Sequence, residues 1–225
     1  MGHFFQSFYE CIIAGQSYIT ILKGVGVTVL ITFFGLLLGT ALAALLCLMS
    51  RTKSRIARGV EKVYTIVVRG TPVLMLLLLL FYVVFARSDL SAVVIAVIAF
   101  GLNSAAHIDE IMKTALSSVP EGQVKAARTL GFTKFQAFRY VVYPQALAFA
   151  RPVYQNAVIN ILQWTSVVGY ITIADLTRVI NNIGARTAKP FFAIFMGIAF
   201  YLLLGYAVHL IFWLTERRKR GERHD

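Results

Sequence analysis

Charged residues are scarce in this sequence. Of its 225 residues, 58% are hydrophobic and only 14% are charged, whereas a soluble domain carries about a quarter charged residues. The deficit excludes an ordinary soluble globular domain and places the chain among membrane proteins. The net charge of +12 does not indicate a nucleic-acid-binding protein, because the basic residues fall between apolar runs, where they report membrane topology.

Cysteine is also rare, and several catalytic motifs are missing. Cys11 and Cys47 lie far apart, so neither a disulfide framework nor a metal site is indicated. The sequence has no G-x-x-x-x-G-K-[ST] phosphate-binding loop, so any ATP hydrolysis must occur in another chain. There is no metal-ligand cluster and no nucleophile at helical spacing from a base. The sequence therefore argues against a membrane enzyme, and no catalytic residue, metal ligand or cofactor is predicted.

Long apolar runs are what the sequence does contain. Five are long enough to span a bilayer, which takes about 20 residues as a helix; they cover residues 24–50, about 63–86, 90–108, 152–174 and 190–215. The second run has Pro72 in its first turns, where the helix is expected to be loosened, and Arg69 near its start is expected to reach the inner surface. The sequence predicts an all-α integral membrane protein with five transmembrane helices.

The distribution of basic residues predicts the orientation of these helices. Seventeen Lys and Arg fall on one side, in segments 51–69, 113–151 and 217–223, and five fall on the other. Because cytoplasmic loops carry the excess of basic residues, the N-terminus is predicted outside and the C-terminus inside. The predicted organisation is a lead-in at 1–23, a five-span domain at 24–218 with a cytoplasmic loop at about 113–151, and a basic cytoplasmic tail at 219–225.

The lead-in before the first run has an amphipathic pattern. Its large apolar residues recur at helical spacing, which predicts a short helix lying on the outer surface; they are Phe4, Phe5, Phe8, Ile12 and Ile13. A frayed terminus is the alternative.

The longest polar stretch, residues 121–144, begins with signals for a helix. Ser118 and Glu121 stand three residues apart, as in a capping box that starts a helix, with Pro120 compatible with its first turn. Gly131 can adopt the left-handed conformation that ends such a helix.

A second helix is predicted directly after this bend. Thr133 and Gln136 form another capping box, and Pro144 is expected to end the helix before the fourth apolar run. A folded helix–bend–helix element on the cytoplasmic surface either docks in a groove of another protein or lies on the lipid headgroups, and composition alone leaves both open.

The stretch resembles the cytoplasmic loop of membrane subunits of ATP-binding-cassette importers, which has the form E-A-A, three residues, G, nine residues, I-x-L-P. Here K-A-A begins at Lys125, and Gly131 and Pro144 keep the spacing, while Lys125 replaces the usual glutamate and Tyr143 the usual leucine. The segments "VRGTPVLMLLLLLFY", "LNSAAHIDEI" and "TSVVGYITIADLTRVI" are similar to the polar amino-acid branch, the histidine/glutamine/arginine-type permeases. The resemblance covers about residues 24–218.

The resemblance implies a set of partners. Two permease subunits, identical or sister chains, would form a path across the prokaryotic cytoplasmic (inner) membrane, two cytoplasmic ATP-binding subunits would grip their loops, and an extracytoplasmic binding protein would deliver the amino acid. The loop residues implied to couple to the ATPase are Glu121, Lys125, Ala126, Ala127, Gly131 and Pro144. The lysine suggests either an acidic group facing it in the partner groove or the divergent half of a heterodimer.

Polar residues inside the runs are candidates for the substrate path. Asn156, Asn160 and Gln163 are spaced i, i+4, i+7 and so share one helical face, which either lines the path or hydrogen-bonds between packed helices. Asn103 and His107 in the third run are also four residues apart and could offer donors and acceptors to a polar amino acid.

Three basic residues, Arg178, Arg186 and Lys189, fall in the last loop on the predicted outer side. They could meet an acidic face on the binding protein or simply decorate a solvated loop.

The main rival is a stand-alone ion-coupled carrier or a channel. Such carriers place ionisable residues near the bilayer midplane, whereas here every Asp and Glu is expected at or beyond the end of a run, and no inverted repeat is found. Asp109 and Glu110 end the third run beside Lys113, where they either pair with it at the surface or close an inner gate.

Overall fold

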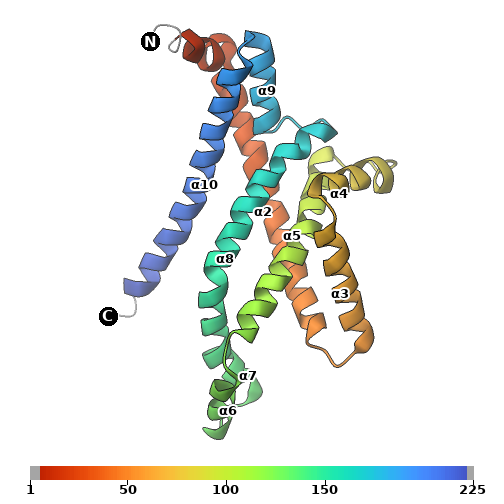
Figure 1. Cartoon of the computed structure of the whole chain (residues 1–225), viewed down its shortest axis with the longest axis vertical. Helices are drawn as coiled ribbons and strands as arrows, with labels where there is room; N and C mark the ends of the chain where they lie inside the picture. Colours follow the sequence, from red (N-terminus) through yellow and green to blue (C-terminus); the bar gives the residue numbers. More distant parts are fainter. Residues whose placement is uncertain (1–5, 222–225) are drawn as a thin grey trace.

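The computed structural model describes residues 6 to 221, except for the side chains of residues 218 to 221, and every regular element in that part is helical (Figure 1). The α-helices are α2 (Ser17–Ser50), α3 (Arg55–Gly70), α4 (Val73–Leu79), α5 (Ala92–Ser117), α6 (Glu121–Thr129), α7 (Lys134–Ala137), α8 (Tyr143–Trp164), α9 (Leu176–Thr187) and α10 (Pro190–Gly221). Short π or 3₁₀ turns join them at Tyr9–Ile13, Ala14–Gln16, Leu80–Val84, Phe138–Val142 and Thr165–Ile171. The predicted all-α class is confirmed for this part of the chain.

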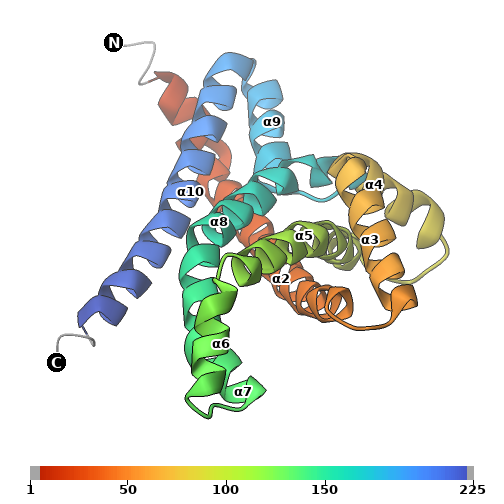
Figure 2. The ribbon, with the colours of Figure 1, turned by 60° about the horizontal axis from the view of Figure 1, so that its bottom comes forward.

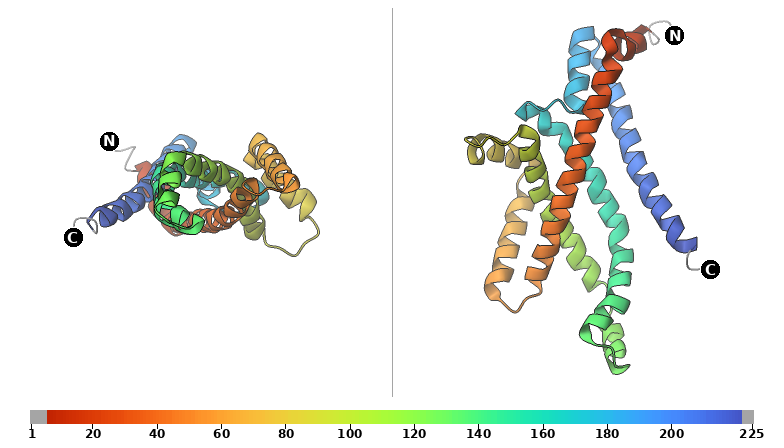
Figure 3. Two further views of the ribbon diagram at one scale, coloured as in Figure 1. Left: turned by 90° about the horizontal axis from the view of Figure 1, so that it is seen from below. Right: turned by 180° about the vertical axis from the view of Figure 1, so that it is seen from behind.

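Three helical segments are long and apolar enough to cross a membrane: Gln6–Ser50, Ala92–Ser117 and Pro190–Arg217. Two further segments pass the same test only as bent pairs, Arg55–Gly70 with Val73–Val84 and Lys134–Ile171 with Leu176–Thr187. The described residues therefore hold three to five candidate spans. In Figures 1 and 3, α6 and α7 project at one end of the molecule, α9 lies at the other, and α10 runs along one side. Arg151 of α8 donates to the Phe212 carbonyl of α10 at 2.8 Å.

The second apolar run, predicted as a span over about 63–86, falls on a bent pair of helices and not on one straight helix. α3 and the α4 segment meet at 105°, and Thr71 and Pro72 between them are extended, with ψ of 126° and 134°. The residue before a proline is pushed out of the helical region, and proline has no N–H to continue the ladder. The proline therefore breaks the run instead of loosening it.

The start of the fourth helical segment also differs from the prediction. Pro144 does not end the preceding helix, because α7 passes through the π turn Phe138–Val142 directly into α8, and the Tyr143 N–H is bonded to the Phe138 carbonyl. Pro144 is the second residue of α8, directly after this π turn, so the N–H that it lacks falls where the hydrogen bonding changes from the π to the α pattern. α8 then ends at Trp164, and a 3₁₀ turn continues to Ile171.

The closest helix pair, α2 with α5, depends on small residues. A Cβ added at Gly39 would lie 1.9 Å from Ser104 Oγ, and one at Gly101 would lie 2.6 Å from a Leu38 methyl carbon. The Ser104 hydroxyl donates to the carbonyl of Gly35 across the interface. Small residues at a membrane helix interface permit this close approach of backbones, which holds α5 in place for the site described below.

Replacing Gly39 with alanine is therefore expected to destabilise the protein. Overpacking of this kind costs about 1–3 kcal/mol, which outweighs the gain of up to about 1 kcal/mol in helix propensity. The matched control is Gly26→Ala on the same helix, because a Cβ there meets nothing within 4 Å. Thermal unfolding in detergent should show a lower midpoint for Gly39→Ala only; equal midpoints would contradict the packing argument.

The lead-in bends sharply before α2, at Gly15 and Gln16, whose φ angles are 64° and 55°. Phe4 and Phe5 lie outside the described residues. Phe8 and Ile13 are exposed, and Ile12 packs against a cluster of buried residues from α2, α9 and α10. The lead-in is thus helical from Gln6 and attached to the rest of the chain.

The three basic residues predicted in the last outer loop all make contacts within the chain, and Arg178 and Arg186 belong to α9. They bind as follows: Arg178 donates to the Gly169 carbonyl at 2.8 Å, Arg186 donates to the Ser17 hydroxyl, and Lys189 pairs with Glu10. The last two contacts tie the lead-in to the corner between α9 and α10. Sequence alone could not reveal this, because the partners lie about 170 positions away.

Candidate functional site

A cavity of about 410 Å³ opens between α5 and α8, beside the end of α3. α5 lies between α3 and α8, as Figures 1 and 2 show. The fourteen lining residues are Arg69, Ser104, His107, Ile108, Glu110, Ile111, Thr114, Phe149, Val153, Asn156, Ala157, Asn160, Ile161 and Trp164. Apolar walls with a few convergent polar groups are typical of small-molecule sites.

Three of the five predicted path residues meet in this cavity. Asn156 and Asn160 project from α8, and His107 faces them from α5. The His107 ring lies 5.2 Å from the Trp164 ring, centroid to centroid. The site thus combines carboxamide donors and acceptors, an imidazole and an aromatic face.

The other two predicted path residues do not line the cavity. Asn103 is only 2% exposed, and its Oδ1 has no hydrogen-bond partner among the described residues. Gln163 is exposed, outside the lining. On a helical wheel the cavity face of α8 is centred beyond Asn160, away from Gln163, which therefore falls at its edge.

Two charged residues that were not predicted as path residues line the cavity. Arg69 is the next-to-last residue of α3, Glu110 belongs to α5, and their side chains approach to 3.7 Å between Nη1 and Oε2. Their side chains are 46% and 39% exposed. In the sequence, Arg69 stands out only as an arginine at the start of an apolar run. Nothing near it in the sequence indicates that it pairs with Glu110, 41 positions later.

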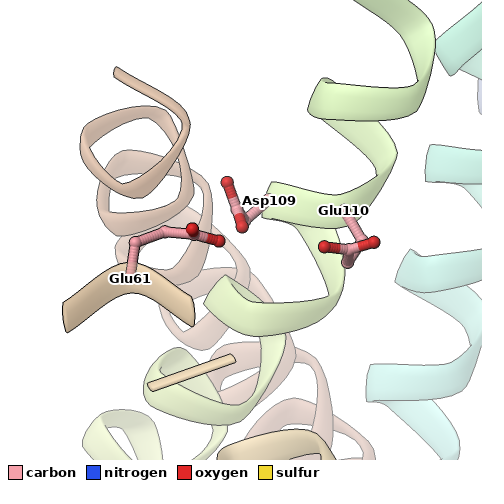
Figure 4. A group of neighbouring side chains, drawn as sticks. All are labelled: Glu61, Asp109 and Glu110. Atoms are coloured by element: carbon pink, nitrogen blue, oxygen red, sulfur yellow. The ribbon is translucent and has the colours of Figure 1, made fainter. Parts of the chain in front are cut away.

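Behind the cavity, Lys113 joins three carboxylates. Its ammonium lies 2.7 Å from Glu61 Oε1 and 3.0 Å from Asp109 Oδ2, and it also pairs with Glu110. Figure 4 shows Glu61 reaching from α3 toward Asp109 on α5, with Glu110 directed to the other side. Oxygens of the three carboxylates lie within 4.8 Å of one another, close enough to share a cation, and Lys113 supplies that positive charge.

The position of Asp109 differs from the one expected for the acidic residues, which is at or beyond the end of an apolar run. The predicted pairing with Lys113 is confirmed, but Asp109 lies within α5 with no exposed surface, so this pair is not at the surface and the residue is not at the end of the helix. A buried carboxylate is costly unless paired, and Lys113 one turn further along α5 provides the partner. α5 continues to Ser117, beyond the point where the apolar run ends.

The loop at the projecting end begins differently from the prediction. α6 starts at Glu121 with Pro120 before it and no side-chain cap, so the predicted capping box at Ser118 is wrong. The Ser118 hydroxyl donates instead to the carbonyl of Ala115, at 2.8 Å. Because α5 reaches almost to this serine, its hydroxyl is used at the end of α5.

The bend and the second cap of the loop are confirmed. Gly131 has a φ of 89°, and Thr133 and Gln136 form both hydrogen bonds of a capping box. The bend is closed by the Phe132 N–H, which donates to the Ala127 carbonyl at 3.1 Å.

The surface that α6 presents is mostly small and polar. Ala127 is buried, whereas Ala126 and Lys125 are exposed. Lys125 pairs with Glu121 at 3.6 Å, with side chains 78% and 90% exposed, and such a pair contributes little to stability.

Comparison with known proteins finds a matching family and similar permease proteins. Residues 32–221 match the family described as "Binding-protein-dependent transport system inner membrane component". The chain is 32% identical over 210 residues to the histidine/lysine/arginine/ornithine transport system permease protein of Salmonella typhimurium, covering 87% of this chain and 88% of that protein. It is 34% identical over 206 residues to the L-cystine transport system permease protein of Bacillus subtilis, covering 90% and 88%.

Solved structures give the same result. A crystal structure of an amino acid ABC transporter with histidines aligns with a TM-score of 0.81 and 31% identity, over 89% of this chain and 94% of that one. The methionine transporter MetNI in an inward-facing conformation aligns with a TM-score of 0.71 over 92% and 99% of the chains. At 19% identity, the second match bears on the fold alone.

Proposed function

The chain belongs to the family of inner-membrane components of binding-protein-dependent transport systems, and we propose that it carries a polar or charged amino acid along the cavity between α5 and α8. It is a permease subunit of an ATP-driven amino-acid importer and not an enzyme, since ATP hydrolysis belongs to separate subunits in this family.

The observation that carries the proposal is the composition of the cavity. Asn156, Asn160 and His107 offer donors and acceptors in a cleft with apolar walls, which is what a polar amino acid needs in place of its water. We place Asn103 behind this surface, where its unpartnered Oδ1 can serve a group that enters, and Gln163 at the edge of the path.

The loop supports a mechanical link to the ATPase. The coupling residues of the proposal are Glu121, Lys125, Ala126, Ala127, Gly131 and Pro144, and they belong to α6, to the bend and to the first turn of α8. Because α7 continues into α8 without a break, a push on α6 reaches the helix that lines the cavity. The partners implied by the family are two ATP-binding subunits, a second permease chain, identical or sister, and an extracytoplasmic amino-acid-binding protein.

The proposal includes five spans in a prokaryotic cytoplasmic membrane. Each bent pair counts as one span, so that the loop of α6 and α7 faces the cytoplasm and the lead-in lies outside, as the charge distribution predicts. The chain then divides into the lead-in at 1–23, the permease domain at 24–218 and the basic tail at 219–225.

This orientation predicts a labelling pattern in intact cells. A cysteine introduced at Ser88 should react with a membrane-impermeant thiol reagent, and one at Thr133 should react only after the cells are opened. Both positions are exposed, and the natural cysteines are buried, so the background is low. Labelling at Thr133 but not at Ser88 would overturn the orientation.

Reconstitution tests the function itself. The chain, purified with the subunits that accompany it, should take up amino acid into vesicles only when ATP and the binding protein are both supplied. Uptake by the chain alone, driven by an ion gradient, would favour the rival carrier.

A further inference from the structure

We propose that Arg69 and Glu110 bind the α-carboxylate and the α-ammonium of the transported amino acid, so that its side chain lies toward Asn156 and Asn160. The inference rests on the proposed function, because it assigns the ends of a substrate within the same cavity.

The charges of the cavity carry the assignment. Arg69 and Glu110 are the two formally charged side chains among the fourteen that line it, they have opposite signs, and they come from different helices. An α-amino acid carries its own two opposite charges on groups attached to a single carbon. A pair of opposite charges placed 3.7 Å apart and facing a polar cleft matches that head group whatever the side chain is.

Arg69 has hydrogen-bond donors that the described residues leave unused. A guanidinium offers five N–H donors in a planar fork, and among the described residues Arg69 has one partner, Glu110. That contact, at 3.7 Å, is longer than a hydrogen bond. A carboxylate is the group that such a fork binds with two parallel hydrogen bonds.

Glu110 belongs to a cluster with excess negative charge. Glu61, Asp109 and Glu110 share the ammonium of Lys113 and the guanidinium of Arg69, which leaves one formal negative charge uncompensated. A substrate ammonium beside Glu110 would neutralise it, and Glu110 is the carboxylate of the three that reaches the cavity. Substrate binding would therefore replace the contact between Arg69 and Glu110 with two better ones.

Binding to the purified complex, without the binding protein, tests the assignment. The probes are L-histidine, L-lysine, L-arginine, L-glutamine and L-cystine, measured by calorimetry. The tightest binder is then compared with its decarboxylated amine and its α-hydroxy acid; for L-histidine these are histamine and imidazolelactate. In the unmodified complex each analogue should bind about 10- to 100-fold more weakly than the amino acid, because each lacks one charged group and the hydrogen bond that this group makes.

The variants show which residue reads which group. Arg69→Met should weaken binding of the amino acid by a similar factor but leave binding of the amine unaffected. Glu110→Gln should also weaken binding of the amino acid but leave binding of the hydroxy acid unaffected. Arg69→Lys, which keeps the charge but not the fork, should fall between. Arg58→Met is the matched control, because Arg58 is exposed on α3 outside the cavity, and its affinities should be unchanged.

Each result bears on one proposal or on both. If the complex binds an amino acid but Arg69→Met and Glu110→Gln keep the full discrimination against the analogues, the head-group assignment fails and the path stands. If none of the five amino acids binds, the cavity is not a substrate site and both fail. Arg69→Met leaves Glu110 paired with Lys113, so folding should survive. Should it not, equal binding of the amine and the amino acid by the unmodified complex would still overturn the assignment.

Discussion

Replacing Gly131 with valine is expected to abolish the stimulation of ATP hydrolysis by substrate while the complex still folds and assembles. Gly131 has a φ of 89°, a region that a β-branched residue rarely enters, and holding a residue there costs about 1–3 kcal/mol. Space is not the problem, because a Cβ at this position would meet nothing within 4 Å. The bend between α6 and α7 would open, and movement of the ATPase subunits would no longer reach α8.

Gly131→Asn is the matched control, because asparagine tolerates the left-handed region far better than valine. Reconstituted complexes should be compared for ATPase activity with and without substrate-loaded binding protein, and for retention of the ATPase subunits on a sizing column. Full stimulation in Gly131→Val would show that the bend does not transmit the movement.

Replacing Asn160 with leucine is expected to reduce substrate uptake by about 10- to 100-fold while assembly and basal ATPase activity persist. Asn160 faces the cavity, and an apolar side chain there would leave a polar group of the substrate without a partner, a loss of about 1–3 kcal/mol. Leucine has nearly the same size, so the shape of the cavity should change little.

The comparison variant is Gln163→Leu on the same helix. If the cavity defines the path, this exposed residue at its edge should matter much less than Asn160. Equal losses for both variants would restore the three-residue stripe as the path. Failure of Asn160→Leu to assemble would show instead that the stripe is a packing seam between helices.

Features that depend on neighbours in sequence were the ones that could be predicted. The left-handed Gly131 and the capping box at Thr133 need only residues within one turn, and both are present. The long apolar runs likewise indicated the helices. The break at Pro72 was signalled locally, but its angle depends on what α4 packs against, which includes α5.

The pairings that build the site could not be predicted in the same way. Arg69 meets Glu110 because α3 packs beside α5 in the folded chain. The acidic residues of the third run were expected at a surface because the apolar run ends there, yet α5 continues and buries Asp109. Cross-helix contacts of this kind have no periodic signature in one sequence.

The ammonium of Lys113, held by carboxylates of both α3 and α5, has a consequence for how the subunit moves. Glu61 and Asp109 are buried, and leaving a buried charge without its partner costs about 3–5 kcal/mol, so these two helices should travel as one rigid body during each transport cycle. The compliant joints are then the extended residues Thr71 and Pro72 and the cavity boundary with α8. Spin labels on α3 and α5 should keep their distance as ATP binds, whereas labels on α5 and α8 should not.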